Sequence, residues 1–291
     1  HSVLEGSEKF PVKDPFVELV KGSLNTFLNA MTYPDKTVYP VASCNDKDFQ
    51  NLMDVYLDGV FHPSIYREPK IFKQEGWHYE LPSEDAPLTV NGVVYNEMKG
   101  AFSSPESVLE RFTSSVLFPD TPYSNESGGD PAVIPNLSYE QFIQFHKDYY
   151  HPANSYIYLY GDMDMEEKLL WLDKEYLSAY DKNDYNLDSS IALQKPFSEP
   201  VEKETVYSVT ANEGTEDNTY LSLNTVVGTD IDPVLYVAFQ ILDYTLISAP
   251  GAPLKQALID AHIGQDIMGG YENGILQPYF SVVAKNANKE Q

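Results

Sequence analysis

The sequence predicts a mixed α+β fold in which the strands pair in antiparallel fashion. Residues 46–61 form a clear amphipathic helix, because their apolar side chains recur at helical spacing. The β-prone stretches 204–211 and 219–227 follow one another without an intervening helix, which favours antiparallel pairing. With 291 residues, 42% of them hydrophobic, the chain is long enough for one large domain or two ordinary ones.

The chain is expected to open with a helix and a hairpin. Asp14 is a candidate helix N-cap because a proline follows it at the first helical position. Apolar residues continue from there at helical spacing to Phe27, which predicts a helix. Residues 28–32 are compatible with late helix or with strand. A turn at 33–36 leads into a β-prone run at 37–41, where a proline indicates a strand end or a sheet edge.

The middle of the chain alternates predicted helices with one strand and two irregular stretches. We expect a long loop at 118–135 and a polar linker at 181–202. A strand is expected at 155–160, where tyrosine alternates with aliphatic residues. Helices are predicted at 93–102, 103–117, 139–150 and 165–180, with a further short helical piece within 72–77. The helix at 103–117 begins with a capping-box pattern at 103–106.

Beyond the linker, the pattern predicts two strands, two helices and a final strand. The helices are expected at 236–247 and 254–263, separated by a Pro-Gly-Ala-Pro break, and the last strand at 276–284. This set is too small for a complete domain of its kind. We therefore expect a first domain at 1–190 and the opening part of a second at 191–291.

Charge and composition limit the classes of partner. The 44 acidic residues against 19 basic ones give a net charge of −25, which disfavours nucleic acid and anionic membranes and favours cationic ligands such as basic peptides. The same charge is equally compatible with a role in solubility alone. No apolar run approaches the roughly 18 residues that a membrane helix needs. The only cysteine, Cys44, excludes an intrachain disulfide and fits a reducing compartment; as a nucleophile it is a weak candidate.

Few residues point to chemistry by spacing alone. No two of the six histidines lie four residues apart, so the chain holds no complete His-x-x-x-His zinc helix. His1 by itself is only an N-terminal residue. Glu97 lies among apolar residues of the 93–102 helix, and a carboxylate drawn into that apolar face would need a partner. The residues by themselves favour an ordinary exposed helix glutamate.

Residues 10–43 and 93–102 carry a more specific signal. Together with His1, they closely resemble the inverted-zincin metallopeptidases of the pitrilysin and insulinase type (family M16), in particular the presequence-protease branch. The resemblance runs from His1 to about Ala287. It implies two-layer domains, each with a mostly antiparallel sheet packed against helices. It also implies that the chain is a fragment whose first residue is the last histidine of the His-x-x-Glu-His motif.

The resemblance assigns roles to individual residues. It implies that His1 and Glu97 are Zn²⁺ ligands, and that the first histidine and the general-base glutamate lie upstream, so that this chain contains no catalytic residue of its own. Glu5 follows the motif, at a position where relatives often carry cysteine, and is not that base. The implied substrate-binding residues form an edge strand and an apolar pocket beside the metal: Leu28, Asn29, Ala30, Met31 and Thr32, with Leu4 and Phe16. Their alternatives are a plain hairpin and ordinary core.

The function implied by the resemblance is that of a zinc endopeptidase acting on short, unstructured, basic peptides. Its partners would be peptide substrates and the missing C-terminal half of the same monomeric protein, with no nucleic acid or membrane involved. The 291 residues alone are expected to be inactive. One alternative is a non-catalytic homologue that serves as a peptide-binding or structural subunit; another is an unrelated acidic ligand-binding module. The resemblance and the single cysteine favour the bacterial cytoplasm, with the mitochondrial matrix as the alternative.

Overall fold

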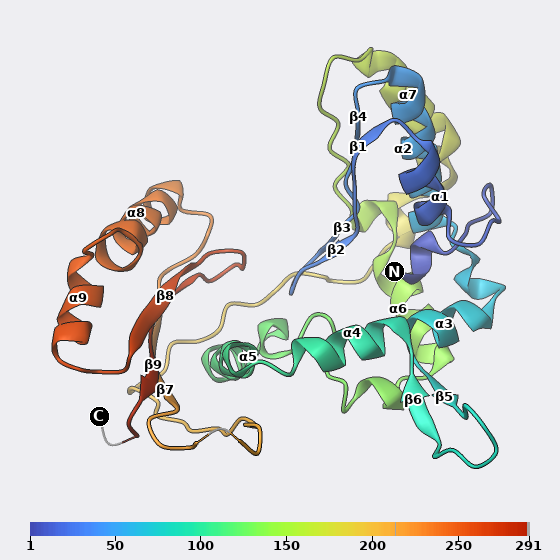
Figure 1. Cartoon of the computed structure of the whole chain (residues 1–291). Coiled ribbons are helices and arrows are strands. Elements are labelled where there is room, and N and C mark those ends of the chain that lie inside the picture. The colour runs from blue at the N-terminus through green and yellow to red at the C-terminus, as the bar shows by residue number, and fades with distance from the viewer. Residues whose placement is uncertain (213, 290–291) are drawn as a thin grey trace. The chain divides into compact units, whose positions relative to one another are not determined.

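The computed structural model describes residues 1–212 and 214–289, and these form two compact units. Unit 1 comprises His1–Gly100 and Gly128–Ser190, and unit 2 comprises Ala101–Ser127 and Ile191–Gln291. Both units combine helices with antiparallel strands (Figure 1), which confirms the α+β class predicted from the sequence.

Unit 1 is mainly helical, with three small strand pairs. Its helices are α1 (Pro15–Gly22), α2 (Asp46–Phe61), α3 (Pro69–Glu75), α4 (Val93–Ala101), α6 (Tyr139–Tyr149) and α7 (Met165–Glu175). Its strands are β1 (Asn25–Leu28) paired with β4 (Val41–Ser43), β2 (Met31–Thr32) with β3 (Thr37–Val38), and β5 (His78–Glu80) with β6 (Thr89–Asn91). All three pairs are antiparallel, and the predicted turn at 33–36 closes the β2–β3 hairpin.

Helix α2 carries the core of unit 1, and its predicted bounds are confirmed. Asn45 caps its N-terminus by accepting a hydrogen bond from the Asp48 amide at 3.0 Å. Leu52, at 0% exposure, packs in a buried cluster with Val3, Leu4, Leu19, Val55 and Tyr56. This cluster holds the N-terminal segment of the chain against α2.

Helix α1 is shorter than its apolar spacing predicts. The N-cap is confirmed, since the Asp14 carboxylate accepts from the Val17 amide at 2.9 Å. The helix ends at Gly22, however, and Phe27 lies on strand β1 with 44% exposure. The Asn25 side-chain amide donates to the Leu19 carbonyl at 3.1 Å and so satisfies an acceptor at the helix end. The prediction that helical spacing continues to Phe27 is therefore wrong.

Unit 2 is built on a three-stranded sheet in the order β7-β9-β8. Its strands are β7 (Thr219–Val226), β8 (Asp266–Glu272) and β9 (Tyr279–Ala287), both pairs being antiparallel. Its helices are α5 (Pro105–Leu117), α8 (Pro233–Asp243) and α9 (Pro253–Asp260), with a π-helical turn at Tyr244–Ser248. Figure 1 shows α8 and α9 alongside β8. A second buried cluster contains Phe118, Tyr123 and Tyr279.

Strand β8 is absent from the sequence prediction because glycine interrupts it. Gly269 has φ +138°, and a Cβ built there would lie 2.2 Å from the Ser281 carbonyl oxygen on β9. The close approach of the two strands therefore requires glycine at this position. Glycine has low β-propensity, so a local pattern predicts a turn where the sheet in fact continues.

Two predicted strands do not form. Residues 155–160 and 204–211 have no regular secondary structure, although both have β-prone sequences. A β-prone sequence supplies only a preference, while a strand also needs a neighbour to complete its hydrogen-bond ladder. The loop at 118–135 is confirmed and contains two short 3₁₀ turns.

One apolar stretch also differs from expectation. An 18-residue window within Pro233–Asp260 has a mean hydropathy of 1.2, so by length and composition this stretch is long and apolar enough to cross a membrane. The expectation that no segment reaches this threshold is therefore wrong. The stretch consists of α8, the π-helical turn and α9, with a break at residues 249–252.

Candidate metal centre

The structure brings the two predicted zinc ligands together. His1 precedes a short 3₁₀ turn (Ser2–Leu4), and Glu97 lies on α4, far along the chain. The His1 Nε2 atom and the Glu97 Oε2 atom are 3.5 Å apart. The imidazole and the carboxylate therefore face each other across a short gap within unit 1.

This separation fits two ligands of one zinc ion. In a tetrahedral site with metal–ligand distances of roughly 2.1 Å, neighbouring ligand atoms lie about 3.4 Å apart. The two side chains are half exposed or more, at 51% and 60%, so the space between them is open to solvent. Among residues 1–212 and 214–289, no group of three or more His, Cys, Asp or Glu forms a complete metal site. His1 and Glu97 can thus supply only part of a zinc coordination shell.

A third residue, Glu75, completes the arrangement around His1. It lies at the end of α3, and its Oε2 atom is 3.6 Å from the other imidazole nitrogen, Nδ1. Its side chain is only 6% exposed, and the Gln74 side-chain amide donates to it at 2.8 Å. A carboxylate on the non-coordinating nitrogen of a histidine is the usual way in which proteins orient a metal-binding imidazole.

Sequence reasoning missed Glu75, although a weak signal was available. Phe72 and Glu75 are three positions apart on a short helix, so they lie on the same face. Phe72 is buried, and Glu75 is therefore drawn into an apolar environment with it. A buried carboxylate needs a partner, and His1 and Gln74 provide one.

The charges around the imidazole shift the pKa values of the site. The contact with Glu75 raises the pKa of His1 above its ordinary value, aided by the negative charges of nearby glutamates and opposed by partial burial. Burial acts to raise the pKa of Glu75, but the contacts with His1 and Gln74 outweigh it and hold this pKa below its usual range. Burial, together with the charge of Glu75, raises the pKa of Glu5 to about 7. The site is therefore strongly acidic and attracts cations.

Glu97 is exposed, as the residues of its helix favour. Its side chain is 60% exposed, so the apolar neighbours do not draw it into the core. The next residue, Met98, is the one that α4 buries, at 9% exposure. The alternative of a partly buried Glu97 is therefore wrong, and its carboxylate faces His1.

A buried network fixes the chain directly after His1. The Asp58 carboxylate, at 1% exposure, accepts from the Lys9 amide at 2.7 Å and contacts His62 Nδ1 at 3.2 Å. The Ser64 amide donates to the Gly6 carbonyl at 2.8 Å. These bonds fasten the segment that carries His1 to the end of α2, which limits how far the imidazole can move.

The predicted apolar and edge-strand residues lie near one another in unit 1. Leu4 is buried in the α2 cluster, and Phe16, Leu28 and Ala30 pack against that cluster. Met31 and Thr32 form β2, paired with Val38 and Thr37. The Asn29 amide donates to the Pro40 carbonyl at 3.2 Å, and the Asn29 side-chain oxygen accepts from the Ala30 amide at 2.9 Å. The structure thus places the apolar members in the core, and their role in substrate binding stays a prediction.

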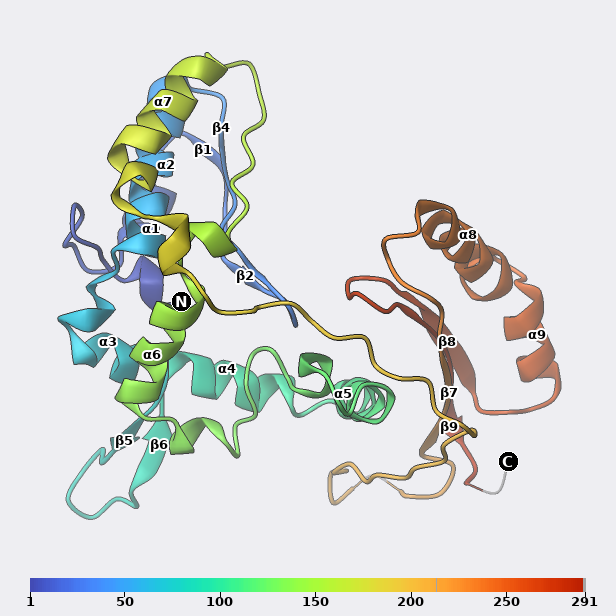
Figure 2. The same cartoon turned by 180° about the vertical axis from the view of Figure 1, so that it is seen from behind.

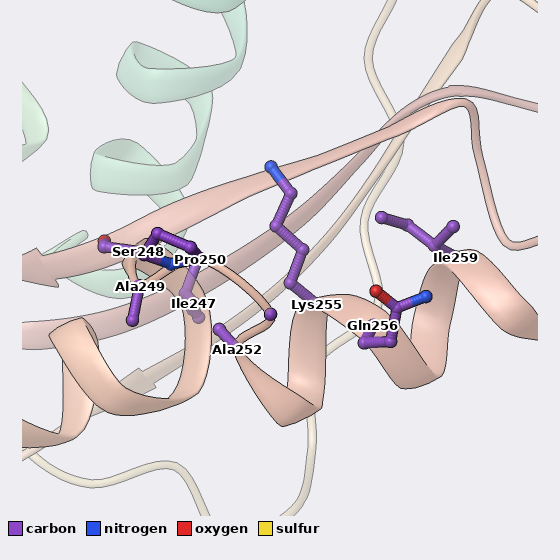
Figure 3. Close-up of a pocket in the computed structure, with 9 residues that line it drawn as sticks. Ile247, Ser248, Ala249, Pro250, Ala252, Lys255, Gln256 and Ile259 are labelled. Carbon is purple, nitrogen blue, oxygen red and sulfur yellow. The ribbon is translucent and has the colours of Figure 1, made fainter.

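Unit 2 contains a cavity of about 260 Å³. Residues 247–252 line it together with Lys255, Gln256 and Ile259 (Figure 3). Its one charged side chain is already engaged, because Lys255 Nζ donates to the Ile267 carbonyl at 2.8 Å and to Asp266 at 3.2 Å. None of the residues that line the cavity is a His, Cys, Asp or Glu, so it offers none of the usual zinc ligands.

Comparison with known proteins identifies the family of the chain. The profile of the family described as "Peptidase M16 inactive domain" matches residues 136–290. Protein HypA of Clostridium perfringens is 54% identical over 293 residues, which cover 100% of this chain and 30% of that protein. Presequence protease 1, chloroplastic/mitochondrial, of Arabidopsis thaliana is 45% identical over 294 residues, which cover 100% of this chain and 27% of that protein. A solved structure, a protease from Helicobacter pylori, matches with a TM-score of 0.64 at 15% identity, over 99% of this chain and 64% of that one.

The fold, with small antiparallel sheets packed against helices, is shared with this solved structure. The chain belongs to the M16 peptidase family, whose profile covers more than half of it, and the predicted resemblance to presequence proteases is confirmed. It spans 27–30% of the length of these two relatives. The M16 domain that matches residues 136–290 is typically non-catalytic, and His1, Glu75 and Glu97 all lie outside the matched range.

Proposed function

We propose that these residues belong to a zinc-dependent endopeptidase that degrades short, unstructured, basic peptides. The observation that carries the proposal is the pair His1 and Glu97, 3.5 Å apart, with Glu75 on the opposite nitrogen of the imidazole. Two ligands from separate segments, oriented by a buried carboxylate, are expected of a catalytic zinc site that is completed by other ligands.

The residues of this chain would hold and orient the metal. His1 and Glu97 would bind Zn²⁺, Glu75 would keep His1 Nδ1 protonated and Nε2 free, and Asp58 would anchor the following segment. Zinc, when bound, supplies Lewis-acid chemistry for amide hydrolysis. The general base and the remaining histidine ligand would come from chain outside residues 1–291. The net charge of −25 supports a preference for cationic peptides.

Peptide cleavage by the full-length gene product tests the proposal. A short basic peptide without stable structure, and an acidic peptide of equal length, are incubated with the parent protein, with Glu97→Gln and with the 291-residue chain. We expect the parent to cleave the basic peptide faster, and we expect neither Glu97→Gln nor the 291-residue chain to cleave it. Glu68→Gln serves as the matched control, because Glu68 is an exposed helix N-cap residue whose side chain makes no capping bond. Failure of the parent to cleave either peptide would overturn the proposal, and cleavage by the 291 residues alone would overturn the inference that the general base lies outside them.

A second function is favoured by one observation. The family profile that matches residues 136–290 is that of an inactive domain, which supports a peptide-binding or structural role for this part of the chain. Under this alternative, the parent would bind the basic peptide without cleaving it, and Glu97→Gln would leave binding unchanged. Measuring binding and cleavage with the same peptide therefore distinguishes the two functions.

A further inference from the structure

Gln74 lies directly beside the carboxylate that orients His1. It is the next-to-last residue of α3, and its side-chain nitrogen, Nε2, donates to Glu75 Oε1 at 2.8 Å. The other carboxylate oxygen, Glu75 Oε2, faces His1 Nδ1 at 3.6 Å. One oxygen of Glu75 therefore contacts an amide while the other contacts the imidazole. In both views the N-terminal end of the chain lies near α3, in keeping with these contacts (Figures 1 and 2).

The contact between Gln74 and Glu75 is not a by-product of helix geometry. Adjacent residues of an α-helix project about 100° apart, so their side chains do not normally face each other. Here α3 ends at Glu75, whose side chain is turned inward and only 6% exposed, while Gln74 is exposed. The Gln74 side chain therefore runs from the surface to a buried carboxylate.

A second carboxylate fixes the orientation of the amide. Gln74 Nε2 also lies 3.4 Å from Glu5 Oε2, on the segment that follows His1. Both neighbours are carboxylates, which accept hydrogen bonds, so the NH₂ group of Gln74 and not its carbonyl oxygen must face them. The amide can direct one hydrogen at each carboxylate, and the weaker contact with Glu5 steadies the stronger one with Glu75.

The Glu75 carboxylate depends on this donor. Apart from Gln74 and His1, no residue within 1–212 and 214–289 makes a hydrogen bond or ion pair with it. A buried carboxylate that loses a hydrogen bond is left poorly satisfied and is no longer held in one orientation. Glutamine supplies the hydrogen bond without a positive charge, which would repel a metal cation held by His1.

We propose that Gln74 is a positioning residue of the candidate metal centre, because its amide holds the Glu75 carboxylate against His1 Nδ1. The inference rests on the proposed function, since it requires that His1 binds zinc. It goes beyond that proposal by extending the centre to a residue that acts only through Glu75. An ordinary surface glutamine, by contrast, would have no effect on zinc affinity.

The zinc affinity of the full-length gene product, measured by competition with a chromophoric chelator, tests the inference. Gln74→Ala should fold normally, because the residue is exposed and alanine favours a helix. It should bind zinc about threefold to tenfold more weakly than the parent, at most the loss expected for Glu75→Gln. In a protein that already carries Glu75→Gln, the further loss should be less than about twofold, because Gln74 acts through Glu75.

A spectroscopic readout and a matched control separate positioning from a general structural effect. With Co²⁺ in place of zinc, the visible absorption bands of Gln74→Ala should shift in the same direction as those of Glu75→Gln. Gln144→Ala is the control, since Gln144 is an exposed helix glutamine whose amide donates to the Asp148 carboxylate at 2.7 Å. It should bind zinc as the parent does.

The possible outcomes distinguish this inference from the proposed function. Unchanged zinc affinity in Gln74→Ala, an equal loss with and without Glu75→Gln, or an equal loss in Gln144→Ala would each overturn the inference. A parent that binds zinc but does not cleave the basic peptide would overturn the proposed function and leave the role of Gln74 standing. A parent that binds no zinc would overturn both.

Discussion

Substitution of Glu75 by glutamine removes one negative charge from the candidate metal centre while keeping the size of the side chain. Glu75 contacts His1 Nδ1 but is not itself a candidate ligand, since Glu97 faces the other nitrogen. The account therefore predicts weaker zinc binding in Glu75→Gln and not its abolition. The loss should be smaller than that caused by Glu97→Gln.

The geometry sets the size of the expected effect. Loss of a carboxylate that orients a ligand typically lowers metal affinity by about 10- to 100-fold. Here the contact is 3.6 Å long and the His1 side chain is 51% exposed, which weakens the coupling. We therefore expect the lower end of this range, about tenfold, or about 1.4 kcal/mol of binding free energy.

Competition with a chromophoric chelator measures the affinity in the full-length gene product. The predicted order of zinc affinity is parent, equal to Glu68→Gln, above Glu75→Gln, above Glu97→Gln. An unchanged affinity in Glu75→Gln would refute the role of this residue in orienting His1. A larger loss in Glu75→Gln than in Glu97→Gln would mean that the ligand assignment is reversed.

Three further predictions concern stability and pH. Leu52→Ala should lower the free energy of unfolding by about 2–5 kcal/mol, because Leu52 is fully buried on α2. Urea denaturation measures this loss, and a loss below about 1 kcal/mol would contradict the assigned core. Burial lowers the pKa of His146, whose imidazole bonds the Val60 carbonyl and the Tyr66 hydroxyl, so the folded state binds this proton less well than the unfolded state does. The contribution of His146 to stability should accordingly be fully present above pH 6.5 and should decline as the pH falls below this value. His146→Gln should reduce the dependence of stability on pH. An equal pH profile in both proteins would contradict the role given to the buried, neutral imidazole. Ser138→Ala should cost about 0.5–2 kcal/mol, because Ser138 closes a capping box with Gln141 on α6; no change in the urea midpoint would mean that the cap is not formed in solution.

The helices were the most predictable part of the fold. Asn45 and Ser138 mark helix starts by local hydrogen bonds, and the apolar face of α2 is continuous, so these features depend on near neighbours in the chain. Strands were less predictable because they depend on distant partners. Residues 156–160 have strand propensity but pair with no strand in the part of the chain that the structure describes, whereas Gly269 lies in a strand only because β9 passes close to it.

The candidate site was predictable only in part. Only the resemblance to a known family paired His1 with Glu97, because nothing in their local sequence indicates that the two residues meet. Glu75 was missed because its function depends on the fold of α3 against the N-terminal segment. Glu97 is exposed while Met98 is buried, because neighbouring residues on a helix point to different sides.

The zinc content of the purified full-length gene product tests the central claim most directly. We predict about one zinc ion per chain in the parent and in Glu68→Gln, and little zinc in Glu97→Gln. Absence of zinc from the parent would contradict the metal centre altogether. Full zinc content in Glu97→Gln would show that the centre exists but that its carboxylate ligand is another residue.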